Sequence, residues 1–181
     1  MKATKRAAVE LEFLTRLFYP SLDVLGQFEE INEDDLPPVY GKLLAHDQHM
    51  TVTVESYHGC PVDVHVLHSC RTPTHYQRNS LLTRHTDGQV VLFAILRAAV
   101  SLLAPEVRQE IESETTPLGR ILIQRNVLRN VRLMSLWKVA PADKLREFFQ
   151  LDHSEACYGR TALLYCDAVP VMELLEIVTA G

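Results

Sequence analysis

The spacing of apolar side chains changes near residue 50. Before that point, apolar residues between positions 3 and 18 recur at helical spacing, which predicts an amphipathic helix that ends at Tyr19. An acidic stretch over residues 29–38 ends in two prolines and predicts a solvated loop, and a short apolar helix is expected over residues 39–45. We therefore expect residues 1–48 to form a helical N-terminal segment.

From residue 50 onward the apolar positions alternate with polar ones, as in half-buried strands. Hairpin turns separate several of these runs, and helices are grouped before and between them, which predicts an α+β fold with a mostly antiparallel sheet. The whole chain, residues 1–181, is expected to form one domain whose sheet, with inserted helices, spans residues 50–178. The expected strands are residues 50–57, 62–68, 76–84, 89–100, 121–139, 161–166 and 170–178, and the expected helices are residues 105–113 and 142–150.

Composition adds limits on partners and on location. The 181 residues are 47% hydrophobic and 23% charged, which is ordinary for a globular domain, and the net charge of −5 argues against nucleic acid and membrane partners. No apolar run is long enough to span a bilayer, and acidic residues interrupt the basic N-terminus as no signal peptide would allow. Four scattered cysteines fit buried thiols in a reducing compartment. We expect a cytoplasmic monomer or small homo-oligomer.

Metal and nucleotide chemistry find little support in the sequence. The seven glycines form no phosphate-binding loop, and His65 and His68 would point to opposite faces of one strand. We expect neither a metal nor a cofactor. His153 and Cys157 would pair as imidazole and thiol only on a helix, so a loop histidine and a buried thiol are favoured.

A basic run invites a nucleic-acid hypothesis. On a helix, Arg125, Arg129 and Arg132 would share one face and could bind nucleic acid. On a strand, the arginines of this run would protect a solvated edge, and the negative net charge of the chain favours this second interpretation. The run consists of Arg120, Arg125, Arg129 and Arg132.

Two arginines and two glutamates stand inside runs that otherwise look like buried strand. Arg78 and Arg97 would each need a carboxylate partner if they point inward, and a ligand could provide it in the planar, bidentate form that suits guanidinium. In the last strand, Glu173 and Glu176 point to opposite faces, so that one of them lies on the more buried face. A carboxylate among apolar side chains marks a candidate site.

A series of motifs resembles the chorismate pyruvate-lyase family. The most specific is Thr-Pro-Leu-Gly-Arg at residues 116–120, which is followed by an apolar run, and the other segments have the family's order over residues 50–178. Matching Glu176 needs one extra residue after Pro170, so Glu173 stays an alternative, and Asn79 stands where the family has an acidic residue. The other segments are Tyr76 to Leu82, Asp87-Gly88, Arg97 to Val100, Leu102 to Glu106 and Tyr158 to Arg160.

The resemblance implies a single antiparallel sheet with helices packed on one side and a lyase that converts chorismate to 4-hydroxybenzoate and pyruvate without a cofactor. It implies that Arg78 holds the ring carboxylate and that Glu176 accepts a hydrogen bond from the ring hydroxyl. It also places the backbone at Leu118 and Gly119 beside the ring, with Arg97 or Arg120 on the enolpyruvyl carboxylate. The substrate would be a dianion, for which two cationic groups are expected.

Two other functions fit the same resemblance. Ligand-sensing domains of transcription regulators are similar to this fold and bind small molecules, such as aromatic carboxylates, without turnover. No DNA-binding segment is recognised in the chain, which argues against a complete regulator. A catalytically silent scaffold that pairs with a biosynthetic enzyme is the third hypothesis.

Overall fold

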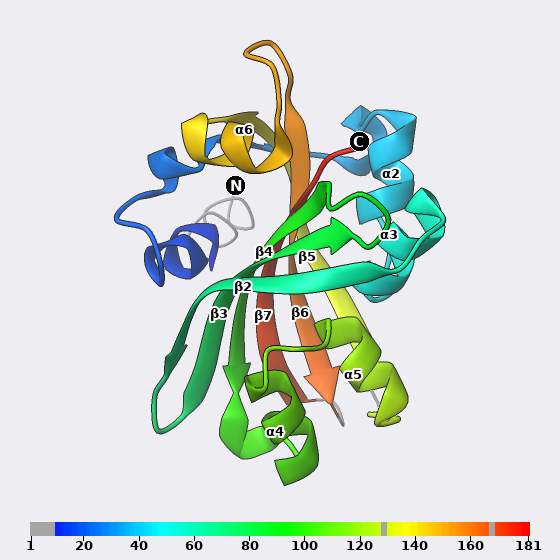
Figure 1. Cartoon of the computed structure of the whole chain (residues 1–181). Coiled ribbons are helices and arrows are strands. Elements are labelled where there is room, and N and C mark those ends of the chain that lie inside the picture. The colour runs from blue at the N-terminus through cyan, green and yellow to red at the C-terminus, as the bar shows by residue number, and fades with distance from the viewer. Residues whose placement is uncertain (1–9, 128–129, 167–168) are drawn as a thin grey trace.

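The computed structural model describes residues 10–127, 130–166 and 169–181, and a single antiparallel sheet organises them (Figure 1). Its seven strands lie in the order β1-β5-β6-β7-β4-β3-β2, and every neighbouring pair is antiparallel. This architecture confirms the predicted α+β class. The strands are β1 (Gly26–Ile31), β2 (Val62–Arg71), β3 (His75–Arg84), β4 (Val90–Ala99), β5 (Asn130–Pro141), β6 (Cys157–Cys166) and β7 (Val169–Val178).

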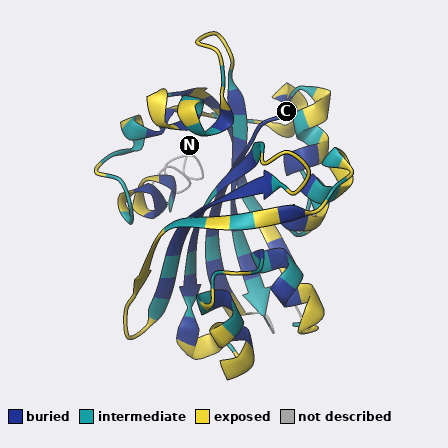
Figure 2. Ribbon diagram, in the orientation of Figure 1, coloured by how far each residue is buried: buried dark blue, intermediate teal, exposed yellow. Residues whose placement is uncertain are grey.

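Helices lie against both faces of this sheet (Figures 1 and 2). The larger group packs on the face of Leu92 and Leu96, whereas helical residues 10–16 and α6 pack on the face of Phe93 and Ile95. The expected grouping on one side therefore holds for α2–α5, with a second, smaller layer opposite. The helices are α2 (Pro38–Leu44), α3 (Met50–His58), α4 (Pro105–Glu112), α5 (Leu118–Gln124) and α6 (Asp143–Phe149), with short 3-10 turns at Leu22–Val24, Glu33–Asp35 and Val100–Leu102.

The strand predicted over residues 50–57 is wrong, because this segment forms helix α3. Alternating threonine and valine suggested a strand, since β-branched residues favour extended backbone. In the structure Met50 and Val54, one helical turn apart, are buried together against the sheet. Gly59 ends the helix with φ of 66°, a left-handed conformation that glycine adopts without strain.

Two further predictions fail in part. The strand expected over residues 121–139 begins only at Asn130, because Leu118–Gln124 forms α5 and buries Ile121 and Leu122. The loop expected over residues 29–38 begins inside strand β1, which pairs with β5 along the sheet edge. The exposed Glu29 of β1 suits an edge strand, where charge discourages further pairing. The expected N-terminal helix is seen from residue 10, and its residues 3–9 lie outside the described residues. Arg129 of the basic run also lies outside them.

Across the described ranges, none of the helices combines the length and apolar character that crossing a bilayer requires. The same part of the chain holds no group of three histidine, cysteine, aspartate or glutamate side chains that could share a metal ion.

Candidate functional site

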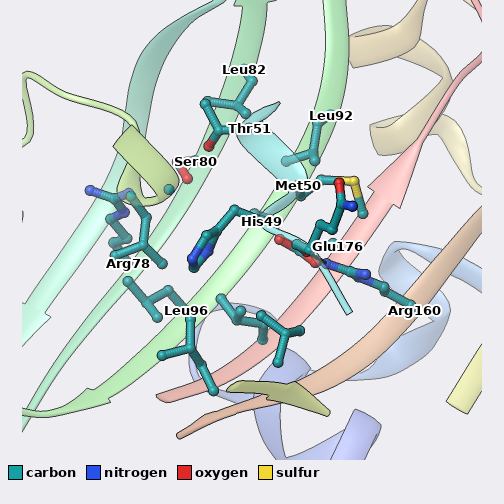
Figure 3. A pocket seen from close by; sticks show the side chains of 17 residues that line it. His49, Met50, Thr51, Arg78, Ser80, Leu82, Leu92, Leu96, Arg160 and Glu176 are labelled. Carbon is teal, nitrogen blue, oxygen red and sulfur yellow. Dashed lines mark hydrogen bonds and ion pairs between the residues drawn. The ribbon is translucent and has the colours of Figure 1, made fainter. Parts of the chain in front are cut away.

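A pocket lies between one face of the sheet and the N-terminal ends of α3 and α5 (Figure 3). The centre of a water-sized sphere can move within about 40 Å³ of this pocket. Because the sphere extends one water radius beyond its centre, the cavity itself is larger and has room for a small molecule. The walls are mostly aliphatic, and the polar groups gather at a few points. The lining residues are Gln48, His49, Met50, Thr51, Arg78, Ser80, Leu82, Leu92, Ala94, Leu96, Leu118, Gly119, Val131, Arg160, Leu164, Leu174 and Glu176.

Strand alternation explains why Arg78 is in the pocket. Arg78, Ser80 and Leu82 share one face of β3, and all three line the cavity. Asn79, between Arg78 and Ser80, points to the opposite face and donates a hydrogen bond to the Tyr19 hydroxyl oxygen at 2.5 Å. The departure from the family's acidic residue at this position therefore lies outside the pocket.

The Arg78 guanidinium is buried without a full set of partners. The residue is 3% exposed, and its Nε and Nη1 have no hydrogen-bond partner among the described residues. Burial lowers the pKa of Arg78, although nearby Tyr76 and Glu114 act in the opposite direction. A buried cation with unused N–H groups is costly unless an anion binds to it, so this group marks a candidate anion site.

A hydrogen-bonded chain beyond Arg78 supplies only part of the missing negative charge. The Tyr76 hydroxyl donates to Glu114 Oε1 at 2.9 Å, and burial with this contact raises the pKa of Tyr76 to about 12. The pKa of Glu114 is lowered most by a hydrogen bond with Ser69 and less by the hydrogen bond with Tyr76. Glu114 is therefore a carboxylate at neutral pH. Because a neutral hydroxyl stands between this carboxylate and Arg78, the guanidinium lacks a direct ionic partner.

The second polar point of the pocket is the ion pair of Glu176 with Arg160. Arg160 Nε donates to Glu176 Oε2 at 2.7 Å, and the two residues are 1% and 7% exposed. Figure 3 shows this pair well separated from Arg78, with the His49 ring between them. The pocket thus has, among the described residues, a cation without an anionic partner in direct contact at one end and a paired carboxylate at the other.

Arg160 also fixes the segment that connects α2 to α3. Its terminal nitrogens donate to the backbone carbonyl oxygens of Leu44, His46 and Gln48 at 3.3, 2.8 and 3.2 Å. These bonds hold residues 44–48 over the Glu176 end of the pocket. A single buried side chain therefore joins the pocket's carboxylate to the segment that covers it.

The first turn of α3 adds positive potential at the pocket wall. His49 is the N-cap residue and makes no side-chain capping bond, and the first intrahelical hydrogen bond is donated by Thr53. The backbone N–H groups before Thr53 include those of Met50 and Thr51, which line the cavity. Free N–H groups at the start of a helix favour a bound anion.

Gly119 allows α5 to approach the start of α3 closely. A Cβ built at Gly119 would lie 2.8 Å from Thr51 Oγ1 and 3.1 Å from His49 Cβ, closer than side chains normally pack. Gly119 and its neighbour Leu118 both line the pocket. The glycine of the five-residue motif is thus explained by helix packing at the cavity wall.

The structure brings four of the predicted site residues together and separates three from them. Arg78, Leu118, Gly119 and Glu176 line one pocket, where their predicted roles remain to be tested. Of the two alternative glutamates, Glu176 lines the cavity and Glu173 does not. The three separated residues are Arg97, Arg120 and Glu173.

Those three residues do not line the pocket. Arg97 Nη1 donates to Glu173 Oε2 at 2.5 Å on the opposite face of the sheet, where the Arg97 guanidinium lies over the Phe13 ring. Arg120 is on helix α5, not on the expected strand, and forms an ion pair with Glu55 of α3 outside the cavity. Strand parity accounts for the first pair, and the missed helix accounts for the second.

Sequence reasoning missed Arg160 and the residues around the start of α3. Arg160 belongs to a motif of the resemblance, but the strand was expected to begin only at Thr161, so no face was assigned to it. Residues 48–51 were missed because a strand was expected there. An arginine two residues before the apolar positions Ala162 and Leu164 was the available signal, since it shares their face.

The structure agrees with the inert interpretation of His153 and Cys157. Cys157 is fully buried, and burial raises the pKa of its thiol to about 12. His153 Nδ1 instead lies 3.4 Å from Arg146 Nη1. Neither residue lines the pocket.

Comparison with solved structures shows the same fold in other proteins. PhnF from Mycobacterium smegmatis matches with a TM-score of 0.54 and 11% identity, over 74% of this chain and 64% of PhnF. Gene product SA0254 from Staphylococcus aureus subsp. aureus N315 matches with a TM-score of 0.50 and 10% identity, over 75% and 90%. A third match, at a TM-score of 0.48 and 11% identity over 65% and 85%, is the ligand-binding domain of a protein assigned to the GntR family of transcriptional regulators in Bordetella bronchiseptica.

These similarities define the fold. The chain has the chorismate lyase-like fold, and it spans less than two thirds of the length of PhnF. No protein-family model matches the chain. The search of curated proteins finds no match either.

Proposed function

We propose that this protein binds a small cyclic carboxylate in the pocket and serves as a ligand-binding module without turnover. The observation that carries the proposal is the buried Arg78 guanidinium, whose Nε and Nη1 have no partner among the described residues. A carboxylate would satisfy these donors and compensate the charge in one step.

The shape and polarity of the cavity support a small ring as the body of the ligand. Aliphatic side chains from β3, β4 and β7 form most of the wall, including Leu82, Leu92, Leu96 and Leu174. Such walls suit the two flat faces of a ring, and the space is too small for a peptide or a dinucleotide. The Glu176 carboxylate at the other end would accept a hydrogen bond from a hydroxyl of the ligand.

Chorismate lyase activity is the second candidate. It is favoured by the common location of Arg78 and Glu176, which are the two residues that the family resemblance implies for the ring carboxylate and the ring hydroxyl. A lyase with this site would act by holding a reactive conformer and stabilising charge on the leaving group. Binding without turnover is preferred because neither Arg97 nor Arg120 lies in the pocket to hold the second carboxylate.

One set of experiments separates these functions. Calorimetric titration with 4-hydroxybenzoate and with chorismate measures binding, and release of pyruvate from chorismate measures turnover. We expect saturable binding of 4-hydroxybenzoate without pyruvate release. Steady release of pyruvate in proportion to enzyme would establish the lyase instead, and no binding of any cyclic carboxylate would refute both proposals.

The variant Arg78→Met tests the observation that carries the proposal. We expect its affinity for 4-hydroxybenzoate to fall by at least ~100-fold, because a desolvated charge-assisted contact is lost. The matched control is Arg97→Met, which removes an arginine from the opposite face of the same sheet and should leave affinity unchanged. Equal loss in both variants would show that the effect is not local to the pocket.

A further inference from the structure

The arginine and glutamate side chains that line the pocket add up to a single excess positive charge. Among the described lining residues, the fixed charges belong to Arg78, Arg160 and Glu176. Glu176 and Arg160 neutralise each other through their hydrogen bond of 2.7 Å. Arg78 is therefore the one lining cation of the described residues without an anionic partner in direct contact.

Four of the five N–H groups of Arg160 already have acceptors in the protein. Its Nε donates to Glu176, one terminal nitrogen donates to the carbonyls of Leu44 and His46, and the other donates to Gln48. Turning Arg160 toward a ligand would break several of these bonds at once. It would also leave Glu176 without its counter-ion in a buried position, which is strongly unfavourable.

No other arginine of the sheet or of α5 compensates for this shortage. Arg97 is paired with Glu173 on the opposite face, and Arg120 is paired with Glu55. A second carboxylate at the far end of the ring would therefore meet the Glu176 carboxylate without a further arginine to pair with it. Like charges brought together out of water repel strongly, and neither carboxylate could be solvated there.

From these contacts we infer that the pocket selects rings with one carboxylate and rejects rings with two. This inference rests on the proposed binding function and names its ligand class: a monoanion whose opposite end is a hydrogen-bond donor or is uncharged. The Arg78 end provides the charge recognition, and the Glu176 end provides the exclusion.

Three ring acids of similar size test the selection. 4-Hydroxybenzoate has one carboxylate and a para hydroxyl, terephthalate has a second carboxylate at the para position, and monomethyl terephthalate masks that second charge as an ester with one added methyl group. We expect terephthalate to bind at least ~100-fold more weakly than its monomethyl ester in calorimetric titration, as expected for like charges in a desolvated site.

The outcomes separate this inference from the function on which it rests. Equal affinity for terephthalate and its ester, with 4-hydroxybenzoate bound, would overturn the charge selection and leave the binding function standing. Weak binding of both terephthalate and the ester, beside tight 4-hydroxybenzoate, would show exclusion by size and would overturn it as well. Failure to bind any of the three acids would remove the proposed function and the inference together.

The variant Glu176→Gln tests the origin of the exclusion. Glutamine keeps an oxygen for Arg160 and removes the negative charge, so the preference for the ester over terephthalate should shrink by at least ~10-fold. Glu173→Gln is the matched control, because it makes the same change on the same strand at the opposite face, and its preference should equal that of the wild type. An unchanged preference in Glu176→Gln would contradict the inference, and the wild-type series stands even if this variant fails to fold.

Discussion

At the scale of single residues, Arg78 combines a cost in stability with a gain in binding. Its guanidinium is desolvated in the unliganded protein, and two of its nitrogens have no partner among the described residues. Such a group persists only where the surrounding fold is stable enough to hold it. A site that binds an anion gains from this arrangement, because the cation is already desolvated and in position.

This cost predicts that Arg78→Met stabilises the protein in the absence of ligand. Methionine fills a similar volume without a charge, so the free energy of unfolding should rise by about 1–3 kcal/mol. Denaturant unfolding of the two proteins without ligand measures the difference. In Arg97→Met, which loses a partly exposed ion pair, stability should change little or fall slightly. A clear loss of stability in Arg78→Met would mean that Arg78 already has adequate partners.

The sequence indicated some of these residues and not others for a physical reason. An arginine within an apolar strand must have a partner, so Arg78 could be singled out from the pattern alone. The same pattern gave equal weight to Arg97, because alternation within one strand does not say which face carries the pocket. Only the packing of α3 and α5 against one particular face separates Arg78 from Arg97 and Glu176 from Glu173.

At the scale of elements, the start of α3 is the part of the site that local sequence could not predict. Threonine and valine in residues 51–54 favour a strand, and the helix is stabilised by contacts with distant parts of the chain. In contrast, β3, β4 and β7 were predicted within a residue or two, since their alternation matches a half-buried sheet. Periodicity thus located the sheet that carries the pocket but not the helix that closes it.

The contact of α5 with α3 predicts a specific effect of Gly119→Ala. The added methyl group would meet Thr51 Oγ1 at 2.8 Å and would push the two helix starts apart, which should cost about 1–3 kcal/mol of stability and weaken ligand binding. Denaturant unfolding and titration with 4-hydroxybenzoate measure both effects. The control is Gly41→Ala in α2, where the methyl group meets nothing within 4 Å and should stabilise the helix by about 0.5–1 kcal/mol. Similar effects of the two substitutions would contradict the close packing at Gly119.

The segment between α2 and α3 should loosen at acid pH. Burial first, and then the Arg160 guanidinium, lower the pKa of His46 below its ordinary value of 6.5, although the Leu43 carbonyl, Glu176 and Asp47 oppose the shift. His46 Nε2 lies 2.8 Å from the Leu43 carbonyl oxygen, and its Nδ1 accepts from the backbone N–H of Gln48 at 3.2 Å. Protonation of Nδ1 would break the bond to Gln48 and place a second positive charge beside Arg160.

The sign of the pH dependence follows from that lowered pKa. The unfolded chain takes up the proton more readily than the folded one, so His46 should reduce the free energy of unfolding as pH falls below 6.5, until the folded-state pKa is passed. Between about pH 7.5 and about pH 5.5, the free energy of unfolding should therefore fall less in His46→Gln than in the wild type. Burial also lowers the pKa of His58 and His75, and the wild type and His46→Gln share those effects. Identical losses would exclude His46 as a contributor.

At the scale of the whole molecule, the pocket is assembled from segments that are far apart in the chain. Its polar groups come from β3, β6, β7 and the start of α3, and the sheet order places β4 and β7 next to each other although some seventy residues separate them in sequence. The antiparallel α+β class could be predicted, because it depends on local periodicity. The placement of Arg78 and Glu176 in one pocket depends on that nonlocal strand order, and only the family resemblance predicted that these two residues share a site.

The structure of the protein in complex with 4-hydroxybenzoate is the most direct test of the account. We predict that the carboxylate binds within hydrogen-bonding distance of Arg78 Nε or Nη1, that the ring lies against the aliphatic wall of the sheet, and that the hydroxyl points toward Glu176. A ligand bound outside this pocket, or bound with its carboxylate away from Arg78, would contradict the central claim that Arg78 is the anion site.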